Sequence, residues 1–182
     1  MRQRGYVQFA GAPSCGKTTT LDALRTCRKK YPEMARIIIE GGTFGKSIDE
    51  ITKSGNYPTF QERVVLLHRQ YERISAQDDQ GDLHDAGTVS AYAYVQDLPE
   101  PQRTKLTNAI VSHIIKNPPN KVFVFEPLKY TQDGVRHSDP KFQKVIHERI
   151  VKMCEDADLN WELVPNMSLE LRQKFILNAL KK

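Results

Sequence analysis

The sequence has few cysteines and no long apolar run, and these two shortages exclude several classes of protein. Cys15, Cys27 and Cys154 are odd in number, widely separated and in no Cys-x-x-Cys pair. This argues against both a disulfide framework and a zinc site. No apolar run approaches the roughly 20 residues that a membrane span needs, and the N-terminus lacks the apolar core of a signal peptide. We therefore expect a cytoplasmic protein with no membrane partner.

Internal repeats, low-complexity tracts and an extreme net charge are also missing. The chain has 182 residues, of which 39% are hydrophobic, enough for one well-filled core, so we expect a single domain over residues 1–182. Its 27 Lys+Arg and 22 Asp+Glu give a net charge of +5, which is modest for a dedicated nucleic-acid binder and equally suits a phosphorylated small molecule. We interpret the basic cluster at residues 25–31 as a solvated helix end.

Short apolar or β-branched runs alternate along the chain with helical patterns. Strands are predicted at 6–10, 36–40, 121–126 and 160–164, with a weaker one near 81–85. Helices are predicted over 60–75, between 99 and 117, from 140 to about 157, and from about 168. In the helix at 60–75, the expected buried stripe is Phe60, Val64, Leu67, Tyr71 and Ile74. The nearly continuous hydrophobicity of the strands favours an α/β protein with a parallel sheet covered on both faces.

The stretch GAPSCGKTTT, residues 11–20, directly follows the first predicted strand and precedes a helical pattern. Its glycines and lysine satisfy the phosphate-binding pattern G-x-x-x-x-G-K-[ST]. The glycines allow backbone N–H groups to approach phosphate oxygens, and the following helix N-terminus favours anions. Lys17 would reach the β and γ phosphates of ATP, while the Thr18 hydroxyl would ligate Mg²⁺. The predicted nucleotide-binding residues of this P-loop are Gly11, Ala12, Pro13, Ser14, Cys15, Gly16, Lys17, Thr18 and Thr19.

The loops after the other predicted strands would supply the remaining catalytic groups. Glu40 ends the run at 36–40 and would either take a proton from an acceptor hydroxyl or cap a neighbouring helix. Asp85 would hold Mg²⁺ through water, with Asp82 as its rival. Arg136, in a polar segment at about 128–139 that we interpret as a lid, would close over the polyphosphate and bind it.

Two pairs of polar or loop residues have more than one interpretation. Gln61 and His68 lie one residue round the helix from its apolar stripe. They would either contact the acceptor or form a polar helix flank. Pro165 and Asn166 follow the last predicted strand and would either border the adenine or form a plain turn.

The P-loop and the segments DAGTVSAYAY, FVFEPLKYTQDGVR and LVPNMSLELRQKFIL resemble NadR-like P-loop kinase domains, including those of ribosylnicotinamide kinase type. The resemblance covers nearly the whole chain, and its most specific parts are Q-D-G-x-R and V-P-x-x-S-x-x-x-R. It implies a three-layer P-loop fold with a five-stranded parallel sheet in the order 2-3-1-4-5. It also implies ATP, magnesium and a lid arginine that corresponds to Arg136.

The chain departs from the family pattern at two places that would face the substrate. The family often has Asp-Arg where this chain has Asp85 and Ala86. It also has a glutamate followed three residues later by an arginine, where this chain has Glu40 and Thr43. We expect Lys46, Arg63 or Arg73 to compensate for the missing arginines.

These features predict an ATP-dependent kinase that transfers the γ-phosphate to a hydroxyl of a nucleoside-like acceptor. The acceptor would be free or carried in DNA, for example as a hydroxymethylated pyrimidine, since related P-loop kinases act on such groups. Lys17, Glu40, Asp85 and Arg136 are the predicted catalytic residues, and Thr18 and Asp85 the predicted metal ligands. Two alternatives remain: a P-loop ATPase or switch with no phosphoryl acceptor, and a P-loop module that binds nucleic acid without turnover.

Overall fold

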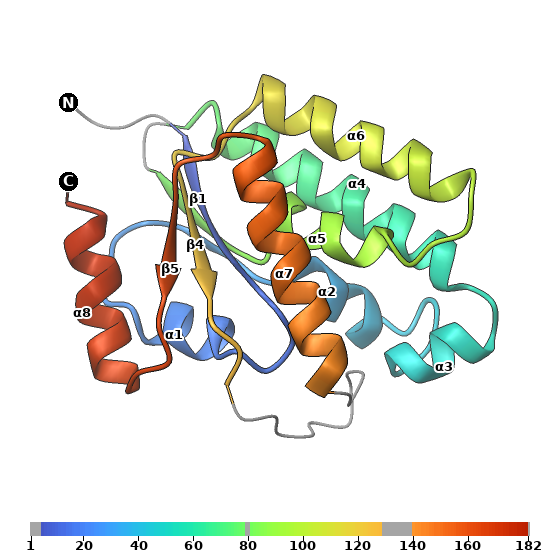
Figure 1. Ribbon diagram of the computed structural model, residues 1–182, viewed down its shortest axis with the longest axis horizontal. Coiled ribbons are helices and arrows are strands. Elements are labelled where there is room, and N and C mark those ends of the chain that lie inside the picture. Colours follow the sequence, from blue (N-terminus) through green and yellow to red (C-terminus); the bar gives the residue numbers. More distant parts are fainter. Residues whose placement is uncertain (1–4, 79–80, 129–139, 182) are drawn as a thin grey trace.

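The computed structural model describes residues 5–78, 81–128 and 140–181. Five parallel strands form one sheet in the order β2-β3-β1-β4-β5, as the family resemblance implies (Figure 1). The strands are β1 (Tyr6–Gly11), β2 (Lys30–Tyr31), β3 (Asp82–Asp85), β4 (Lys121–Phe125) and β5 (Trp161–Val164). The weak prediction of a strand near 81–85 is therefore confirmed.

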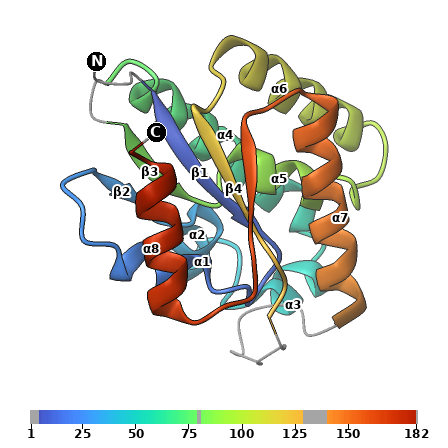
Figure 2. The same ribbon diagram turned by 60° about the vertical axis from the view of Figure 1, so that its left-hand side comes forward.

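Helices cover both faces of the sheet and complete three layers (Figure 2). The helices are α1 (Lys17–Ala23), α2 (Met34–Glu40), α3 (Ile48–Lys53), α4 (Tyr57–Ser75), α5 (Thr88–Val95), α6 (Gln102–Lys116), α7 (Pro140–Asp156) and α8 (Leu169–Ala179). Within the described ranges, no helix combines the length and apolar character that crossing a bilayer requires.

Alternation along the central strands divides the core between the two faces. Phe9 and Phe123 belong to the cluster packed with α1 and α8. Ala10 and Val124 belong to the cluster packed with α5, α6 and α7. Because successive strand residues point to opposite faces, the nearly continuous apolar runs of β1 and β4 bury side chains on both sides. The class predicted from these runs is confirmed.

The prediction of a strand at 36–40 is wrong, because these residues belong to helix α2. Met34, Ile38 and Ile39 are buried at helical spacing, and α2 packs against α4. A five-residue apolar run is too short for its period to distinguish a strand from a buried helix. The helix stop signal was present, since Gly41 is the C-cap and Gly42 has a φ of 70°.

The second strand lies earlier, inside the basic cluster at 25–31 that we interpreted as a helix end. Helix α1 already ends at Ala23, and Lys30 and Tyr31 pair with β3 as an edge strand. The Tyr31 ring is buried and stacks on His84, while the Lys29 ammonium lies 4.5 Å from the centre of that ring. Lys29 is exposed and Lys30 half-buried, and such charged residues are typical of a short edge strand, where charge discourages pairing with another chain.

Helix α4 is buried on a face rotated by one residue from the predicted stripe. Its mostly polar buried side chains are Gln61, Val65, His68, Glu72 and Ser75, with Phe60 and Val64 also buried near its N-terminus. Ile74, predicted to be buried, is 48% exposed. Polar residues turn inward here because the interior provides them with partners, which an apolar periodicity does not register.

Candidate active site

The P-loop connects β1 to α1 as the motif predicts. Gly11 is the last residue of β1, and Gly16 is the N-cap of α1 with a left-handed φ of 81°. Lys17 is buried, and its Nζ donates to the carbonyl oxygens of Gly11 at 2.9 Å and Ala12 at 3.0 Å. The ammonium is thus already inside the loop, where a bound phosphate would need positive charge.

Two side chains from distant helices contact the P-loop, and neither was assigned a role from the sequence. Gln143 of α7 donates through Nε2 to the Pro13 carbonyl oxygen at 2.6 Å. Arg172 of α8 directs Nη1 to the carbonyl oxygens of Cys15 and Gly16, each at 3.4 Å. The only sequence signal for Arg172 was its place as the last residue of the V-P-x-x-S-x-x-x-R motif, and Gln143 had none.

Asp85, rather than Asp82, lies beside the P-loop. The register pairs Phe9 with Asp85, so the carboxylate emerges from β3 at the level where β1 enters the loop. The Thr18 hydroxyl donates to Asp85 Oδ2 at 2.5 Å. Asp82 lies at the opposite end of β3, where it accepts a hydrogen bond from Ser75 at 2.7 Å.

Thr18 and Asp85 fit the oxygen chemistry of a magnesium site. Mg²⁺ retains several waters and takes only one or two protein oxygens beside substrate phosphates, so these two oxygen groups are enough for it. In the described part of the chain, no three His, Cys, Asp or Glu side chains gather as a metal-binding group.

A pocket opens beside the P-loop, between α2, α4, α5 and α7. Pro13 of the P-loop and Ala86, which follows Asp85, line it. Its cavity volume is about 80 Å³, and the cavity opens to solvent. The aromatic side chains in its wall are Tyr57, Phe60, Tyr94 and Phe142, and the polar ones are Glu33, Arg36, Gln61, His68 and Ser90. Aromatic faces with a few polar groups are typical of a site for a flat, polar ring.

Glu40 does not occupy the position predicted for it. It is exposed at the C-terminal end of α2, in a neighbouring hollow that Lys46 also lines. The carboxylate that follows β2 and lines the pocket is Glu33, the N-cap residue of α2. Arg36, three residues after Glu33, lines the same pocket, so the Glu-x-x-Arg spacing of the family is present seven residues before the place assigned to it.

Gln61 and His68 are buried and line the pocket, so their interpretation as a polar helix flank is wrong. Burial lowers the pKa of His68, and the Glu72 carboxylate and, to a smaller extent, the Glu33 carboxylate act against that shift. The imidazole is therefore neutral near pH 7 and offers one hydrogen-bond donor and one acceptor. Arg63 and Arg73 are exposed on α4 and do not line the pocket.

A buried carboxylate holds the start of α5, which supplies one pocket wall. Glu72 accepts hydrogen bonds from the Thr88 backbone N–H at 2.6 Å, the Thr88 hydroxyl at 2.7 Å and the Tyr6 hydroxyl at 3.1 Å. His113 Nε2 lies 3.0 Å from it. Burial alone would raise the pKa of Glu72, but the His113 contact and neighbouring histidines lower it. The network thereby orients Ser90 and Tyr94, two and six residues farther along α5 in the pocket wall.

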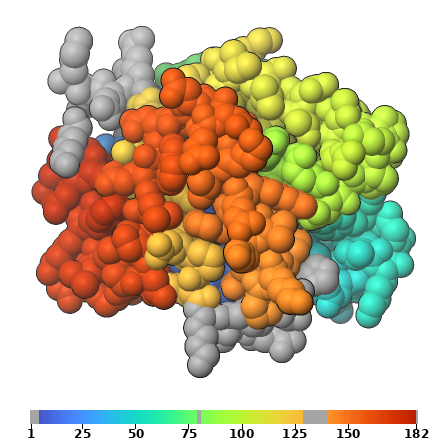
Figure 3. Space-filling model, viewed as in Figure 1, coloured from blue at the N-terminus to red at the C-terminus, as the bar shows by residue number. Residues whose placement is uncertain are grey.

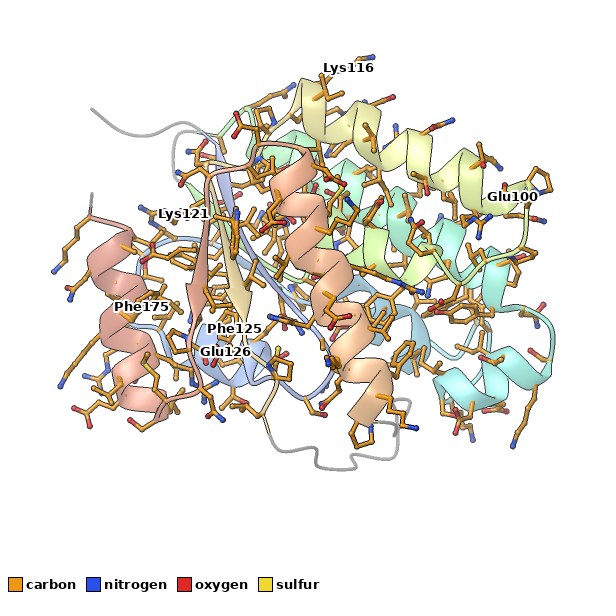
Figure 4. The ribbon with its side chains drawn as sticks, in the orientation of Figure 1. Glu100, Lys116, Lys121, Phe125, Glu126 and Phe175 are labelled. Carbon is orange, nitrogen blue, oxygen red and sulfur yellow. The ribbon has the colours of Figure 1, made fainter. Side chains whose placement is uncertain are left out.

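The end of β4 lies beside the P-loop, since Phe125 pairs with Gly11, and the end of β5 lies next to it. Glu126 follows β4, and its Oε2 accepts from the Asn166 backbone N–H at 2.9 Å (Figure 4). In the space-filling view, atoms of the chain near the end of β4 reach the surface between α8 and α7 (Figure 3). The adenine contacts of Pro165 and Asn166 stay predictions. Arg136 and most of the lid segment lie outside the described residues.

Comparison with known proteins places this geometry in a class. A family model described as AAA domain matches residues 6–172, so the chain belongs to this AAA domain family. A search of curated proteins with the sequence found no match. The fold and the P-loop thus define a P-loop protein with a nucleotide-kinase fold.

Three solved structures illustrate the fold similarity. A NadR protein in complex with NR has a TM-score of 0.78 and 18% identity, and the match covers 98% of this chain and 51% of that one. NadR with NAD and AMP-PNP has a TM-score of 0.66 and 17% identity, over 97% and 48% of the two chains. Thymidylate kinase from Ehrlichia chaffeensis has a TM-score of 0.59 and 12% identity, over 98% and 99%. This chain therefore spans about half the length of the NadR structures.

Proposed function

We propose that the protein is an ATP-dependent kinase that transfers the γ-phosphate to a hydroxyl of a nucleoside-like acceptor. The observation that carries the proposal is the aromatic pocket that shares a wall with the P-loop through Pro13. An acceptor held there would present a hydroxyl to a nucleotide in the P-loop. Such positioning, together with charge stabilisation, supplies most of the catalysis in phosphoryl transfer.

On the nucleotide side, the proposal assigns phosphate binding to the P-loop. Lys17 would exchange its contacts with Gly11 and Ala12 for the β and γ phosphates. The Thr18 hydroxyl and the Asp85 carboxylate would hold Mg²⁺, which neutralises charge on the transferring group. Arg136 stays a prediction for a further cation in the lid.

On the acceptor side, we assign the proton-accepting role to Glu33 instead of Glu40. Glu33 follows β2 and lines the pocket, whereas Glu40 is exposed one helix length away. Arg36 lies one turn further along the same pocket wall and would bind polar or anionic atoms of the acceptor. Gln61 and His68 offer both donors and acceptors to the edge of a base-like ring.

A transfer assay tests the function directly. The protein is incubated with γ-labelled ATP and magnesium against separate sets of nucleosides, nucleotides, ordinary DNA and hydroxymethylpyrimidine DNA. Label on a nucleoside or nucleotide is the expected result, and label on DNA alone would move the acceptor to a polymer. Label released only into water would instead identify an ATPase. Lys17→Ala is the negative control, because it removes the phosphate-binding charge.

Glu33→Gln tests the assignment of the base, with Glu40→Gln as the matched control on the same helix. Glutamine keeps the size and hydrogen bonding of glutamate but cannot take a proton. We expect transfer in Glu33→Gln to fall by roughly 10²- to 10⁴-fold while ATP affinity is retained. Glu40→Gln should stay within about threefold of the unchanged protein. The reverse ranking of the two variants would return the base to Glu40.

A further inference from the structure

We propose that Arg172 is a positioning residue of the P-loop, which holds the loop in the conformation that binds a polyphosphate. The inference rests on the proposed function only in that the bound polyphosphate is ATP. Arg172 lies on α8, one turn after the N-cap Ser168, and is 7% exposed. A buried guanidinium is costly unless its charge and donors are used, so its location requires an explanation.

The contacts of Arg172 are to the loop itself. Nη1 lies 3.4 Å from the carbonyl oxygens of both Cys15 and Gly16. Nε is buried without a hydrogen-bond partner among the described residues. The guanidinium therefore directs its charge at two consecutive peptide groups of the P-loop, where no carboxylate forms a salt bridge with it in the described ranges.

The backbone carbonyls of the P-loop are bound by side chains from three directions. Those of Gly11 and Ala12 accept from Lys17, and that of Pro13 accepts from Gln143. Those of Cys15 and Gly16 face Arg172, and that of Gly16 also accepts from the Thr20 hydroxyl at 2.8 Å and the Thr20 backbone N–H at 3.0 Å. A loop whose carbonyl oxygens are bound by protein donors cannot rotate those peptides freely. Its N–H groups are thereby kept for the anion, which is how a helix N-terminus and its preceding loop bind phosphate.

The sequence at Gly16 makes room for this contact. A Cβ built on Gly16 would lie 2.2 Å from Arg172 Nη1 and 3.2 Å from Leu128 Cδ1, so the end of the Arg172 side chain would have to move. Glycine thus leaves the space that the guanidinium occupies and also adopts the left-handed backbone. Behind the loop, the buried positive charge also raises the potential at the phosphate site.

Equilibrium titration with a fluorescent ATP analogue tests the role of Arg172. Arg172→Met keeps the apolar stem and removes the charge, and Arg172→Lys keeps the charge on a shorter side chain. The matched control is Gln173→Met, which removes the hydrogen bond from the adjacent residue of α8 to Ala23 at the far end of α1. We expect about a tenfold or greater loss of nucleotide affinity in Arg172→Met, a smaller loss in Arg172→Lys and none in Gln173→Met.

Stability and acceptor binding separate a positioning role from a structural one. Urea unfolding of each variant shows whether loss of affinity merely follows loss of folded protein, and the acceptor KM should not change in Arg172→Met. If Arg172→Met does not fold, the ranking of Arg172→Lys against Gln173→Met still decides. Nucleotide affinity within twofold of the unchanged protein in the Arg172 variants would overturn the inference alone. Absence of ATP binding by the unchanged protein would overturn the proposed function and the role of Arg172 together.

Discussion

Replacement of Gly16 by alanine separates backbone strain from a steric clash at the P-loop. Gly16 has φ 81° and ψ 18°, and its added Cβ would meet the Arg172 guanidinium. Gly55, after α3, is the matched control, because its φ is 75° and nothing lies within 4 Å of its added Cβ. The two sites thus impose nearly the same left-handed backbone, and only one of them adds a collision.

The structure sets the expected magnitudes. A left-handed conformation costs a non-glycine residue about 1–2 kcal/mol, and this is all that Gly55→Ala should lose. At Gly16, the guanidinium must also move and give up its contacts with the loop carbonyls. A hydrogen bond that involves a charged group contributes about 1.5–3 kcal/mol, so we expect Gly16→Ala to lose about 2.5–5 kcal/mol of unfolding free energy.

A double-mutant cycle in urea measures the clash. Unfolding is followed for Gly16→Ala, Gly55→Ala, Arg172→Met and the two combinations with Arg172→Met. In the Arg172→Met background, the excess loss of Gly16→Ala over Gly55→Ala should shrink by a coupling of about 1.5–3 kcal/mol, and any remainder reflects Leu128 Cδ1, 3.2 Å from the added Cβ. Gly55→Ala and Arg172→Met should be additive within about 0.5 kcal/mol, since distant sites rarely couple. If Gly16→Ala and Arg172→Met are also additive within about 0.5 kcal/mol, the contact between Gly16 and Arg172 contributes nothing to stability and the reasoning is refuted.

Two further predictions concern the metal site and the response to acid. Asp85→Asn should leave metal-free ATP binding unchanged but remove most turnover at any magnesium concentration, whereas Asp82→Asn should lower only stability. A magnesium titration of the turnover of both variants checks this. Full turnover by Asp85→Asn would exclude its carboxylate as a metal ligand. Burial lowers the pKa of His84 from 6.5 to about 4, so between these values the unfolded state binds more protons than the native state and stability falls as the pH falls. Urea unfolding at pH 7 and pH 5 should therefore show a smaller acid loss for His84→Gln than for the unchanged protein, and an identical loss would mean that His84 does not contribute.

The parts of the site that were predicted are those built from adjacent residues. The P-loop spacing from Gly11 to Thr18 requires a strand before it and a helix after it, and both are present. Asp85 follows from the rule that carboxyl ends of parallel strands share one edge of the sheet. Local sequence specifies such features because the backbone geometry itself forms the binding groups.

The parts that were missed depend on contacts between distant residues. Gln143 reaches Pro13 and Arg172 reaches Gly16 only because α7 and α8 pack on opposite faces of the sheet beside the loop. The buried face of α4 was misassigned for a related reason. Glu72 is turned inward by Thr88, Tyr6 and His113, which lie on three other elements. No periodicity within α4 contains that information.

The error at Glu40 shows how one secondary-structure assignment controls a mechanistic assignment. The rule applied to it, that a carboxylate directly after the second strand faces the phosphate site, still stands. With the run at 36–40 taken as that strand, the rule selects Glu40. With the strand at Lys30 and Tyr31, the same rule selects Glu33, and the arginine missing three residues after Glu40 is found at Arg36. On the proposal that Glu33 is the base, the mismatch with the family pattern at Thr43 follows from the misplaced strand, and Arg36 takes the place for which compensation by Lys46, Arg63 or Arg73 was expected.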